Sequence, residues 1–326
     1  MKNGLLTIKR LKKYFPYKKG LFVKAVDGVD LQIAEGKILG LVGESGSGKS
    51  TIAYTTVGMY SATEGEMVFK GQDINKLAVD RSLDMKGEIQ IVFQDPGSSL
   101  NPRRNIKQIL EVPLKLHSRR EKSGFPSTTK EILEEVGLAQ GYLTKSPRSL
   151  GGGERQLIAI ARSLATKPSL IILDEPTSAL DVSIQAKVIN RLLKLQETFN
   201  LSYLFITHDL SLMRNVADRV AIMYLGKLCE EADTAEFFQR PLHPYTRMLL
   251  SSIPVATEEE EKLKPTKIKS TGEIPSSVYV PSGCSFHLRC PEKMDICPVV
   301  DPEMKLISTG HYVRCHAVKP EDEVNQ

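Results

Sequence analysis

The nine residues GESGSGKST, at positions 43–51, decide the fold of this chain. They match the phosphate-loop pattern G-x-x-x-x-G-K-[ST]. The apolar run ILGLV (38–42) precedes them and a segment of helical character (51–60) follows, which is the strand–loop–helix context in which such loops occur. A fortuitous glycine-rich turn is the alternative. We therefore predict a site for the phosphates of a nucleotide between a buried strand and a helix.

Phosphate binding requires the residue types found in this loop. Glycines let the backbone turn its N–H groups toward one point, and the helix that follows adds the positive end of its dipole. Lys49 is expected to reach the β- and γ-phosphates, and the hydroxyl of Ser50 to ligate Mg²⁺. The predicted ATP-binding loop comprises Gly43, Glu44, Ser45, Gly46, Ser47, Gly48, Lys49, Ser50 and Thr51.

A second element, LIILDEP at 170–176, places two acids at the end of an apolar run. The carboxyl ends of strands are where ligands bind in α/β folds. Asp174 is expected to hold Mg²⁺, directly or through water, and Glu175 to orient and polarise the attacking water. A helix cap or a solvated turn is the usual role of a single acid at a strand end. Beside a phosphate loop, the nucleotide-site interpretation is favoured.

The rest of the pattern indicates an α/β protein. The first forty residues alternate apolar and polar positions, as in an antiparallel sheet. Short apolar runs at 89–93, 170–174 and 203–207 are typical of buried parallel strands. Helical patterns lie between them, as at 182–199, and residues from about 95 to 167 are mostly helical.

After Pro254 the composition changes. Residues 255–271 form a charged, apolar-poor linker, whose simplest role is a solvated tether. Residues 272–326 are rich in Pro, Cys and turn residues and are expected to form a small Cys-rich C-terminal extension. Residues 1–254 are then the nucleotide-binding domain.

Four cysteines of this extension are candidate metal ligands. Five, six and seventeen residues separate Cys284, Cys290, Cys297 and Cys315 in turn. Four thiols this close together in a chain without secretion signals suggest a metal site, and four thiolates suit either an iron–sulfur cluster or tetrahedral Zn²⁺. Four reduced, buried thiols are the alternative. Cys229 lies apart, in an apolar run, and is expected to be a core residue.

The phosphate loop, LIILDEP and further motifs of the chain resemble those of the ATP-binding cassette (ABC) family. The resemblance adds VFQDP (92–96), LGGGERQ (150–156), SALD (178–181) and ITHD (206–209), in the family's order, and covers about residues 5–245. It implies a RecA-like phosphate-loop core with an antiparallel β subdomain and a helical subdomain at about 95–167. It also implies ATP hydrolysis that drives a membrane transporter.

The resemblance assigns roles to single residues. Gln94 matches the glutamine that senses Mg²⁺ and the transmembrane partner, and His208 the histidine that contacts the γ-phosphate. In isolation a Gln after a strand is usually a surface residue and a His a satisfied polar group; only their joint order favours function. The implied loop that contacts the partner's ATP is Leu150, Gly151, Gly152, Gly153 and Glu154, and the implied dimer loop is Ser178, Ala179, Leu180 and Asp181.

An aromatic residue near the N-terminus stacks on adenine in this family. Tyr14 and Phe15 are the candidates, with Phe15, just before Pro16, the first choice. Such stacking contributes on the order of a kcal/mol. An ordinary packed aromatic is the alternative for both.

One position departs from the family pattern. The family's signature loop usually carries Ser where this chain has Gly151. That hydroxyl donates to the γ-phosphate of the ATP held by the partner, and its loss would cost roughly 1.5–3 kcal/mol. We therefore hypothesise that the site using this loop turns over slowly or only binds ATP. Alternatively, neighbouring backbone N–H groups suffice.

Segments 93–102 and 243–254, with the cysteines, resemble the peptide and nickel uptake subfamily, whose relatives also import oligosaccharides. The resemblance implies a heterodimer with a related ATPase, two transmembrane permease subunits and an extracytoplasmic binding protein, with oligopeptides or dipeptides as cargo. It also implies a [4Fe–4S] cluster on the four cysteines. Zn²⁺ remains the alternative, and the absence of a short C-x-x-C spacing favours iron–sulfur.

Composition is consistent with this assignment. Hydrophobic residues make up 41% and charged residues 25% of the 326, as in globular proteins. No apolar stretch approaches the ~20 residues that span a bilayer, and the first residues lack a signal-peptide pattern. We expect a peripheral protein on the cytoplasmic face of the membrane. The net charge of +5 could favour an anionic membrane surface or a nucleic acid, but a surface of mixed sign with a small positive surplus is the favoured interpretation.

Two other functional classes share this fold. A nucleic-acid ATPase of the same fold usually carries coiled-coil insertions or two cassettes in one chain; the sequence has neither, so we expect no nucleic-acid partner. A nucleotide-gated subunit with one degenerate ATP site is conceivable because of Gly151. The favoured function is ATP hydrolysis coupled to import.

Overall fold

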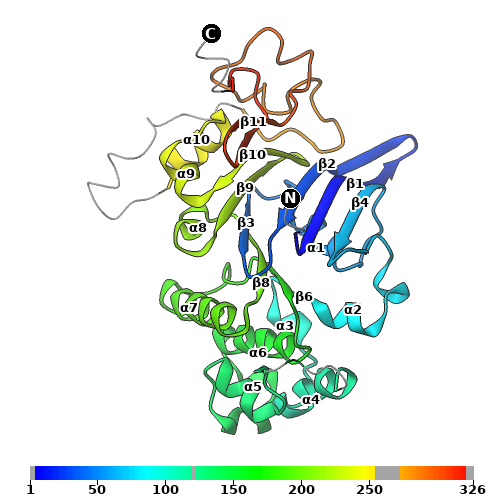
Figure 1. Ribbon diagram of the computed structural model, residues 1–326, viewed down its shortest axis with the longest axis vertical. Helices are drawn as coiled ribbons and strands as arrows, with labels where there is room; N and C mark the ends of the chain where they lie inside the picture. Colours follow the sequence, from blue (N-terminus) through cyan, green and yellow to red (C-terminus); the bar gives the residue numbers. More distant parts are fainter. Residues whose placement is uncertain (1–3, 119–121, 123, 254–271, 321–326) are drawn as a thin grey trace.

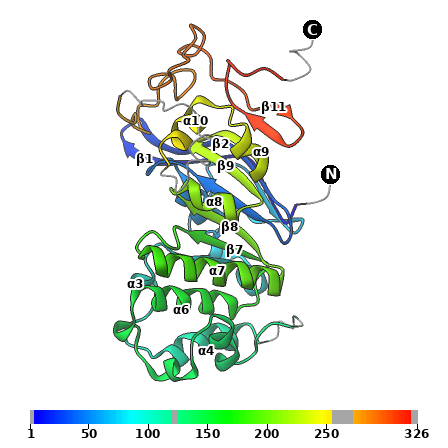
Figure 2. The ribbon, with the colours of Figure 1, turned by 90° about the vertical axis from the view of Figure 1, so that its left-hand side faces the viewer.

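The computed structural model describes residues 4–118, 122, 124–253 and 272–320. Figure 1 shows the small sheet and the C-terminal segment in the upper part and helices α3 to α7 in the lower part, with strands β8 and β6 of the main sheet reaching down to these helices. In the view turned by 90°, α6 and α7 lie side by side beneath the strands (Figure 2).

A small antiparallel sheet contains the N-terminal strands. Its order is β2–β1–β4–β5. The alternating pattern of the sequence is visible in its burial, because Leu6, Ile8 and Leu11 of β1 face the core while Lys9 and Arg10 are exposed. The strands are β1 (Leu6–Lys18), β2 (Leu21–Ile33), β4 (Glu64–Phe69) and β5 (Gln72–Asp73).

The main sheet is mixed, with the order β11–β12–β10–β9–β3–β8–β7–β6. Strands β6, β7, β8, β3 and β9 run parallel, and β10, β12 and β11 continue antiparallel. Every residue of β3, β7 and β8 is buried, which explains their continuous apolar sequences. The strands are β3 (Ile38–Val42), β6 (Ile89–Val92), β7 (Leu170–Asp174), β8 (Ser202–Thr207), β9 (Arg219–Tyr224), β10 (Lys227–Asp233), β11 (Lys305–Ser308) and β12 (His311–Val313).

The helices begin and end at local signals. Capping boxes start α4 at Asn105 and α5 at Thr128, and α7 ends at Asn200, which has left-handed backbone geometry with φ 49°. The helices are α1 (Lys49–Thr56), α2 (Leu83–Glu88), α3 (Pro96–Ser99), α4 (Ile106–Leu116), α5 (Thr129–Glu135), α6 (Gly152–Leu164), α7 (Val182–Phe199), α8 (Leu210–Val216), α9 (Thr234–Gln239) and α10 (Pro244–Ser251). Single 3₁₀ turns are Ala78–Asp80, Gln140–Thr144 and Pro147–Ser149.

These elements match the expected α/β core with an antiparallel and a helical part. Helix α6 packs an apolar stripe against the core, since its Ile158, Ala161 and Leu164 are fully buried. Among the described residues, no helix is long and apolar enough to cross a membrane.

The C-terminal segment differs from the expected small appendage. Strand β12 pairs with β10, and β11 with β12, so the segment extends the main sheet. Phe286 is 1% exposed and belongs to the same core as the parallel strands. The predicted charged linker at 255–271 lies outside the described residues.

Candidate functional site

The phosphate loop connects β3 to α1 and depends on two glycines. A Cβ atom at Gly43 would lie 2.2 Å from the carbonyl oxygen of Met223, and one at Gly48 would lie 2.0 Å from that of Ala25. Gly48 also has φ 109°, a conformation that side chains disfavour. The loop therefore packs its backbone directly on neighbouring strands, which no larger residue at these positions would allow.

Lys49 is buried beneath this loop. Its Nζ atom donates to the carbonyl oxygens of Gly43 at 2.7 Å and Glu44 at 2.9 Å, and to Ser47 Oγ at 3.3 Å. Burial lowers the pKa of Lys49, while the carboxylates of Glu175, Asp174 and Glu44 oppose that shift. The ammonium is thus a rigidly held cation at the loop, able to exchange these bonds for phosphate oxygens.

Ser50 and Asp174 lie together at the end of β7. Ser50 Oγ donates to Asp174 Oδ1 at 2.9 Å. Burial raises the pKa of Asp174, and hydrogen bonds from Ser50 and Tyr54 oppose the shift. A hydroxyl and a carboxylate oxygen are ligands that Mg²⁺ accepts, so the pair fits the expected metal position. Tyr54 was not identified from the sequence; its spacing of one helical turn after Ser50 was the available signal.

Glu175 is the centre of a polar group. Its Oε2 accepts from Gln94 Nε2 at 3.0 Å, and Nδ1 of His208 lies 3.4 Å away. Its backbone has φ 47°, which is uncommon outside glycine, and its N–H donates to the carbonyl oxygen of Ile206. Gln94 also lies 3.5 Å from Ser178 Oγ. Two side chains far apart in the sequence, those of Gln94 and His208, therefore converge on one carboxylate.

A cavity of about 710 Å³ joins the two halves of this site. Glu44, Ser45, Gly46, Gly48, Lys49, Ser50 and Thr51 of the loop line it, together with Gln94, Glu175 and His208. Its remaining wall is Val23, Ala25, Ile274 and Ser277, of which the last two come from the C-terminal segment. That contribution was not anticipated, because no sequence pattern links the segment to the loop.

Tyr14 and Phe15 are not among the residues that line this cavity. The Tyr14 hydroxyl donates to Asp27, and the Phe15 ring packs edge-on against Tyr60 at 5.1 Å between centroids. Phe15 is paired across β1 and β2 with Val23, which does line the cavity. Their role in adenine binding stays a prediction.

The predicted signature loop leads into α6, and its Gly151 and Gly152 are exposed while Leu150 is buried. Gly151 is the N-cap, and its N–H donates to Glu154 Oε2 at 2.8 Å. A Cβ atom at Gly153 would lie 2.4 Å from Ile184, whereas one at Gly151 would have only Glu154 Oε2 at 3.8 Å. None of residues 150–154 lines the cavity of its own chain, so a ligand of this loop would have to be bound elsewhere.

The predicted dimer loop lies between the polar group around Glu175 and the predicted signature loop. Ser178, Ala179 and Asp181 are exposed. Leu180 packs toward Gly152, since a Cβ there would be 3.2 Å from Leu180 Cδ2. The two loops are thus in contact within one chain.

The four cysteines of the C-terminal segment gather but do not form a ligand set. Cys284 donates its backbone N–H to the carbonyl oxygen of Cys297 at 2.7 Å. Burial raises the pKa of Cys284 and Cys290 to about 11, with smaller contributions from neighbouring thiols including Cys315. Across the described residues, no three His, Cys, Asp or Glu side chains are arranged to hold a metal ion. The expected [4Fe–4S] or Zn²⁺ site is therefore not supported by this arrangement. Cys229, by contrast, is a core residue as expected.

The phosphate loop lies beside the acids Asp174 and Glu175 at the end of β7, and Gln94 and His208 contact the second of these acids. This arrangement defines a nucleotide-hydrolysing cassette. The pattern of the family described as "ABC transporter" matches residues 26–178. That described as "Oligopeptide/dipeptide transporter, C-terminal region" matches residues 229–297. The chain is an ATPase of the ABC transporter family and belongs to its oligopeptide/dipeptide transporter group.

Similar proteins extend over nearly the whole chain. The oligopeptide transport ATP-binding protein AppF of Bacillus subtilis is 47% identical over 96% of this chain and 97% of its own length. The dipeptide transport ATP-binding protein DppF of Escherichia coli is 40% identical over 99% of this chain and 97% of its own. Among solved structures, the dimeric bacterial ABC transporter cassette MJ0796 has a TM-score of 0.63 at 30% identity, covering 70% of this chain and 98% of that one.

Proposed function

We propose that this chain is the ATP-hydrolysing subunit of an importer of oligopeptides or dipeptides. The observation that carries the proposal is the single cavity in which Lys49 and Ser50 face Gln94, Glu175 and His208. The cargo is inferred from relatives named for oligopeptide and dipeptide transport. Uptake of nickel or oligosaccharides by the same architecture is the alternative.

The residues of the cavity divide the work of phosphoryl transfer. Loop N–H groups and Lys49 bind the β- and γ-phosphates, and Ser50 with Asp174 would hold Mg²⁺, which neutralises charge on the phosphate oxygens. Glu175 orients the attacking water and receives its proton as the water oxygen bonds to the γ-phosphorus and ADP leaves. Gln94 fixes the Glu175 carboxylate at 3.0 Å, and His208 contacts the γ-phosphate.

A second, related ATPase subunit would complete each nucleotide site. The loop at 150–154, in which Gly151 and Gly152 are exposed, lies outside its own cavity, so we propose that it contacts ATP held by the partner. Negative charge on the γ-phosphate would then hold the two subunits together, and hydrolysis would release them. The heterodimer would also explain how the transporter functions with Gly151, since impairment of one ATP site leaves the other ATP site competent.

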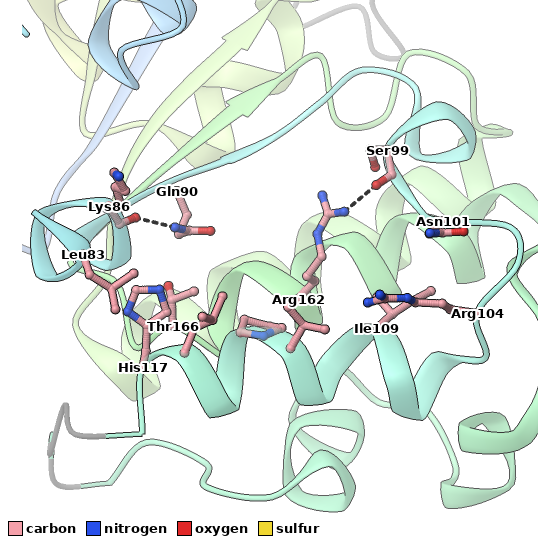
Figure 3. Close-up of a pocket in the computed structure, with 13 residues that line it drawn as sticks. Leu83, Lys86, Gln90, Ser99, Asn101, Arg104, Ile109, His117, Arg162 and Thr166 are labelled. Atoms are coloured by element: carbon pink, nitrogen blue, oxygen red, sulfur yellow. Dashed lines mark hydrogen bonds between the residues drawn. The ribbon is translucent and has the colours of Figure 1, made fainter. Parts of the chain in front are cut away.

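ABC importer ATPases work with transmembrane permease subunits; we propose two of them in the complex and a place where one contacts this cassette. A groove of about 420 Å³ lies between α2, α3, α4 and α6 (Figure 3). Leu83, Val112 and Leu116 along it are 40–56% exposed, an apolar surface suited to a short helix of the partner. Arg162 of α6 donates to the carbonyl oxygen of Ser99 at 2.5 Å across the groove, which connects this surface to the helix that carries the signature loop.

The remaining expectations follow from this assignment. We propose a peripheral position on the cytoplasmic face of the membrane, an extracytoplasmic binding protein that selects the cargo, and no nucleic-acid partner. A metal on Cys284, Cys290, Cys297 and Cys315 would require these side chains to rearrange. The support for it is their electrostatic proximity to one another. Protein purified anaerobically without iron or zinc by elemental analysis would contradict it.

Uptake in proteoliposomes tests the proposed function. The complex of this chain, its partner ATPase, both permeases and the binding protein should accumulate labelled peptide when ATP is supplied. Glu175→Gln should abolish the hydrolysis contributed by this subunit, with Mg–ATP binding retained. Unchanged turnover in the E175Q complex would show that this subunit does not hydrolyse ATP, and accumulation of nickel or an oligosaccharide instead of peptide would reassign the cargo.

A further inference from the structure

The C-terminal segment reaches the phosphate loop through one buried guanidinium. Arg289 is 6% exposed, and its two terminal nitrogens donate to the two carboxylate oxygens of Glu44, at 2.7 Å and 3.0 Å. This bidentate arrangement is the strongest geometry for an arginine–carboxylate pair. The two residues are 245 positions apart in the sequence. One ion pair therefore joins the last part of the chain to the second residue of the loop.

Both members of the pair are held from other directions. Glu44 accepts from Tyr245 Oη at 3.2 Å, and its backbone N–H donates to the same hydroxyl at 3.2 Å. The Arg289 guanidinium lies 5.7 Å from the ring of Tyr224 and 5.9 Å from that of Phe286. The position of the Glu44 backbone, and hence of the loop, is thus coupled to a packed aromatic group.

The same segment forms part of the nucleotide cavity. Ile274 and Ser277 line it. The carbonyl oxygen of Ser277 accepts from the backbone N–H of Lys24 at 3.0 Å, between the two β2 residues, Val23 and Ala25, that also line the cavity. This contact is independent of the ion pair, and it places the segment at a second point of the site.

The charge of Glu44 needs a partner when a triphosphate is bound. Glu44 lines the cavity, and its backbone carbonyl oxygen accepts from Lys49 Nζ at 2.9 Å. An unpaired carboxylate there would repel the phosphates, since partly buried like charges are screened less than exposed ones. Arg289 cancels that charge and holds it on the side of the loop that faces the C-terminal segment.

We propose that Arg289 is a positioning residue for nucleotide binding: through Glu44 it fixes and neutralises the phosphate loop, so affinity for ATP depends on the docked C-terminal segment. The proposal rests on the proposed function of the loop. A partner protein that shifts the C-terminal segment would therefore change the affinity for nucleotide without contacting the nucleotide site.

A double-mutant cycle on the full chain tests the proposal. The readout is the Kd of the non-hydrolysable analogue AMP-PNP with Mg²⁺, by titration calorimetry, on variants whose thermal unfolding shows them to be folded. Arg289→Met should weaken binding about tenfold, or ~1.4 kcal/mol. In the Glu44→Gln background the same change should alter Kd by less than about threefold, because no carboxylate is left unpaired.

Arg314→Met is the matched control. Arg314 also belongs to the C-terminal segment and donates to the carbonyl oxygens of Leu228 and Pro302, at 3.1 Å and 2.9 Å, without contacting the loop. It should lower the unfolding temperature and leave Kd within about twofold of wild type, since distant sites act independently. Equal loss of affinity in both arginine variants would mean that only the stability of the segment matters, and would overturn the proposal.

The outcomes remain distinguishable if one variant fails to fold. Should Arg289→Met not fold, the comparison of Glu44→Gln with Glu44→Gln/Arg289→Met still applies, and a tenfold loss there would contradict the role through Glu44. Wild-type protein without Mg²⁺-dependent affinity would refute the proposed function itself. Wild-type protein that binds, with Arg289→Met binding equally well, would refute this inference alone.

Discussion

Restoring a serine at position 151 is the most informative single change to this chain. Gly151 has φ −69° and ψ 167°, an extended conformation that any residue adopts, and an added Cβ would meet only Glu154 Oε2 at 3.8 Å. At a helix N-cap, serine and glycine differ by only a few tenths of a kcal/mol. Gly151→Ser should therefore leave the fold intact, so that a change in activity reports the hydroxyl.

The magnitude follows from the chemistry of the added donor. A hydrogen bond to an ionised phosphate oxygen contributes about 1.5–3 kcal/mol, which corresponds to roughly 10- to 150-fold in rate if it acts in the transition state. The backbone N–H of Gly151 is already engaged with Glu154 at 2.8 Å. It is therefore not free to replace the missing hydroxyl without breaking that bond.

The assay is steady-state ATP hydrolysis by the assembled complex in a Glu175→Gln background. That change silences the site built on this chain's own loop, so the remaining turnover comes from the site that uses Gly151. Gly151→Ser should raise this turnover at least about tenfold. Gly151→Ala, which adds the Cβ but no hydroxyl, should not. An unchanged rate with serine would refute the reasoning and show that backbone donors suffice.

Two further predictions concern stability. Gly153→Ala should lower the free energy of unfolding by about 1–3 kcal/mol, because its Cβ would lie 2.4 Å from Ile184 and force that side chain to move; denaturant unfolding with Gly151→Ala as control checks this, and equal stability would contradict it. Burial lowers the pKa of His243 to about 4 from an ordinary 6.5, so the unfolded chain binds the proton first and stability should fall as pH drops from 6.5 to 4, by at most ~1.4 kcal/mol per pH unit. His243→Asn should flatten that slope, and a slope that persists unchanged would assign it elsewhere. The charged groups that act on the ring are Glu230, Arg247 and Glu292.

The local parts of the site could be predicted from the sequence. The motifs GESGSGKST and LIILDEP each place their polar residues at the end of a buried strand. The helical spacing of apolar residues was enough to predict the helix at Val182–Phe199. These signals are local, because the residues that form each element are neighbours in the chain. Parallel strands β3 and β7 then bring the two motifs together at one edge of the sheet.

The non-local parts could not be predicted. The pairing of β12 with β10, and that of Arg289 with Glu44, depend on the path of the chain, which no local pattern encodes. Tyr54 was missed because its spacing of one helical turn after Ser50 does not by itself identify Asp174 as its neighbour. The cysteine spacing suggested a metal, but spacing does not fix the direction of side chains, and the described thiols are not arranged as ligands.

Equilibrium binding of Mg–AMP-PNP to wild-type protein and to Lys49→Ala tests the central claim most directly. Lys49 is 4% exposed at the loop that lines the cavity. The account predicts binding that requires Mg²⁺ and that Lys49→Ala weakens about hundredfold or more, from loss of charge-assisted bonds to two phosphates. Wild-type protein without magnesium-dependent affinity, or folded Lys49→Ala that binds as tightly as wild type, would contradict it.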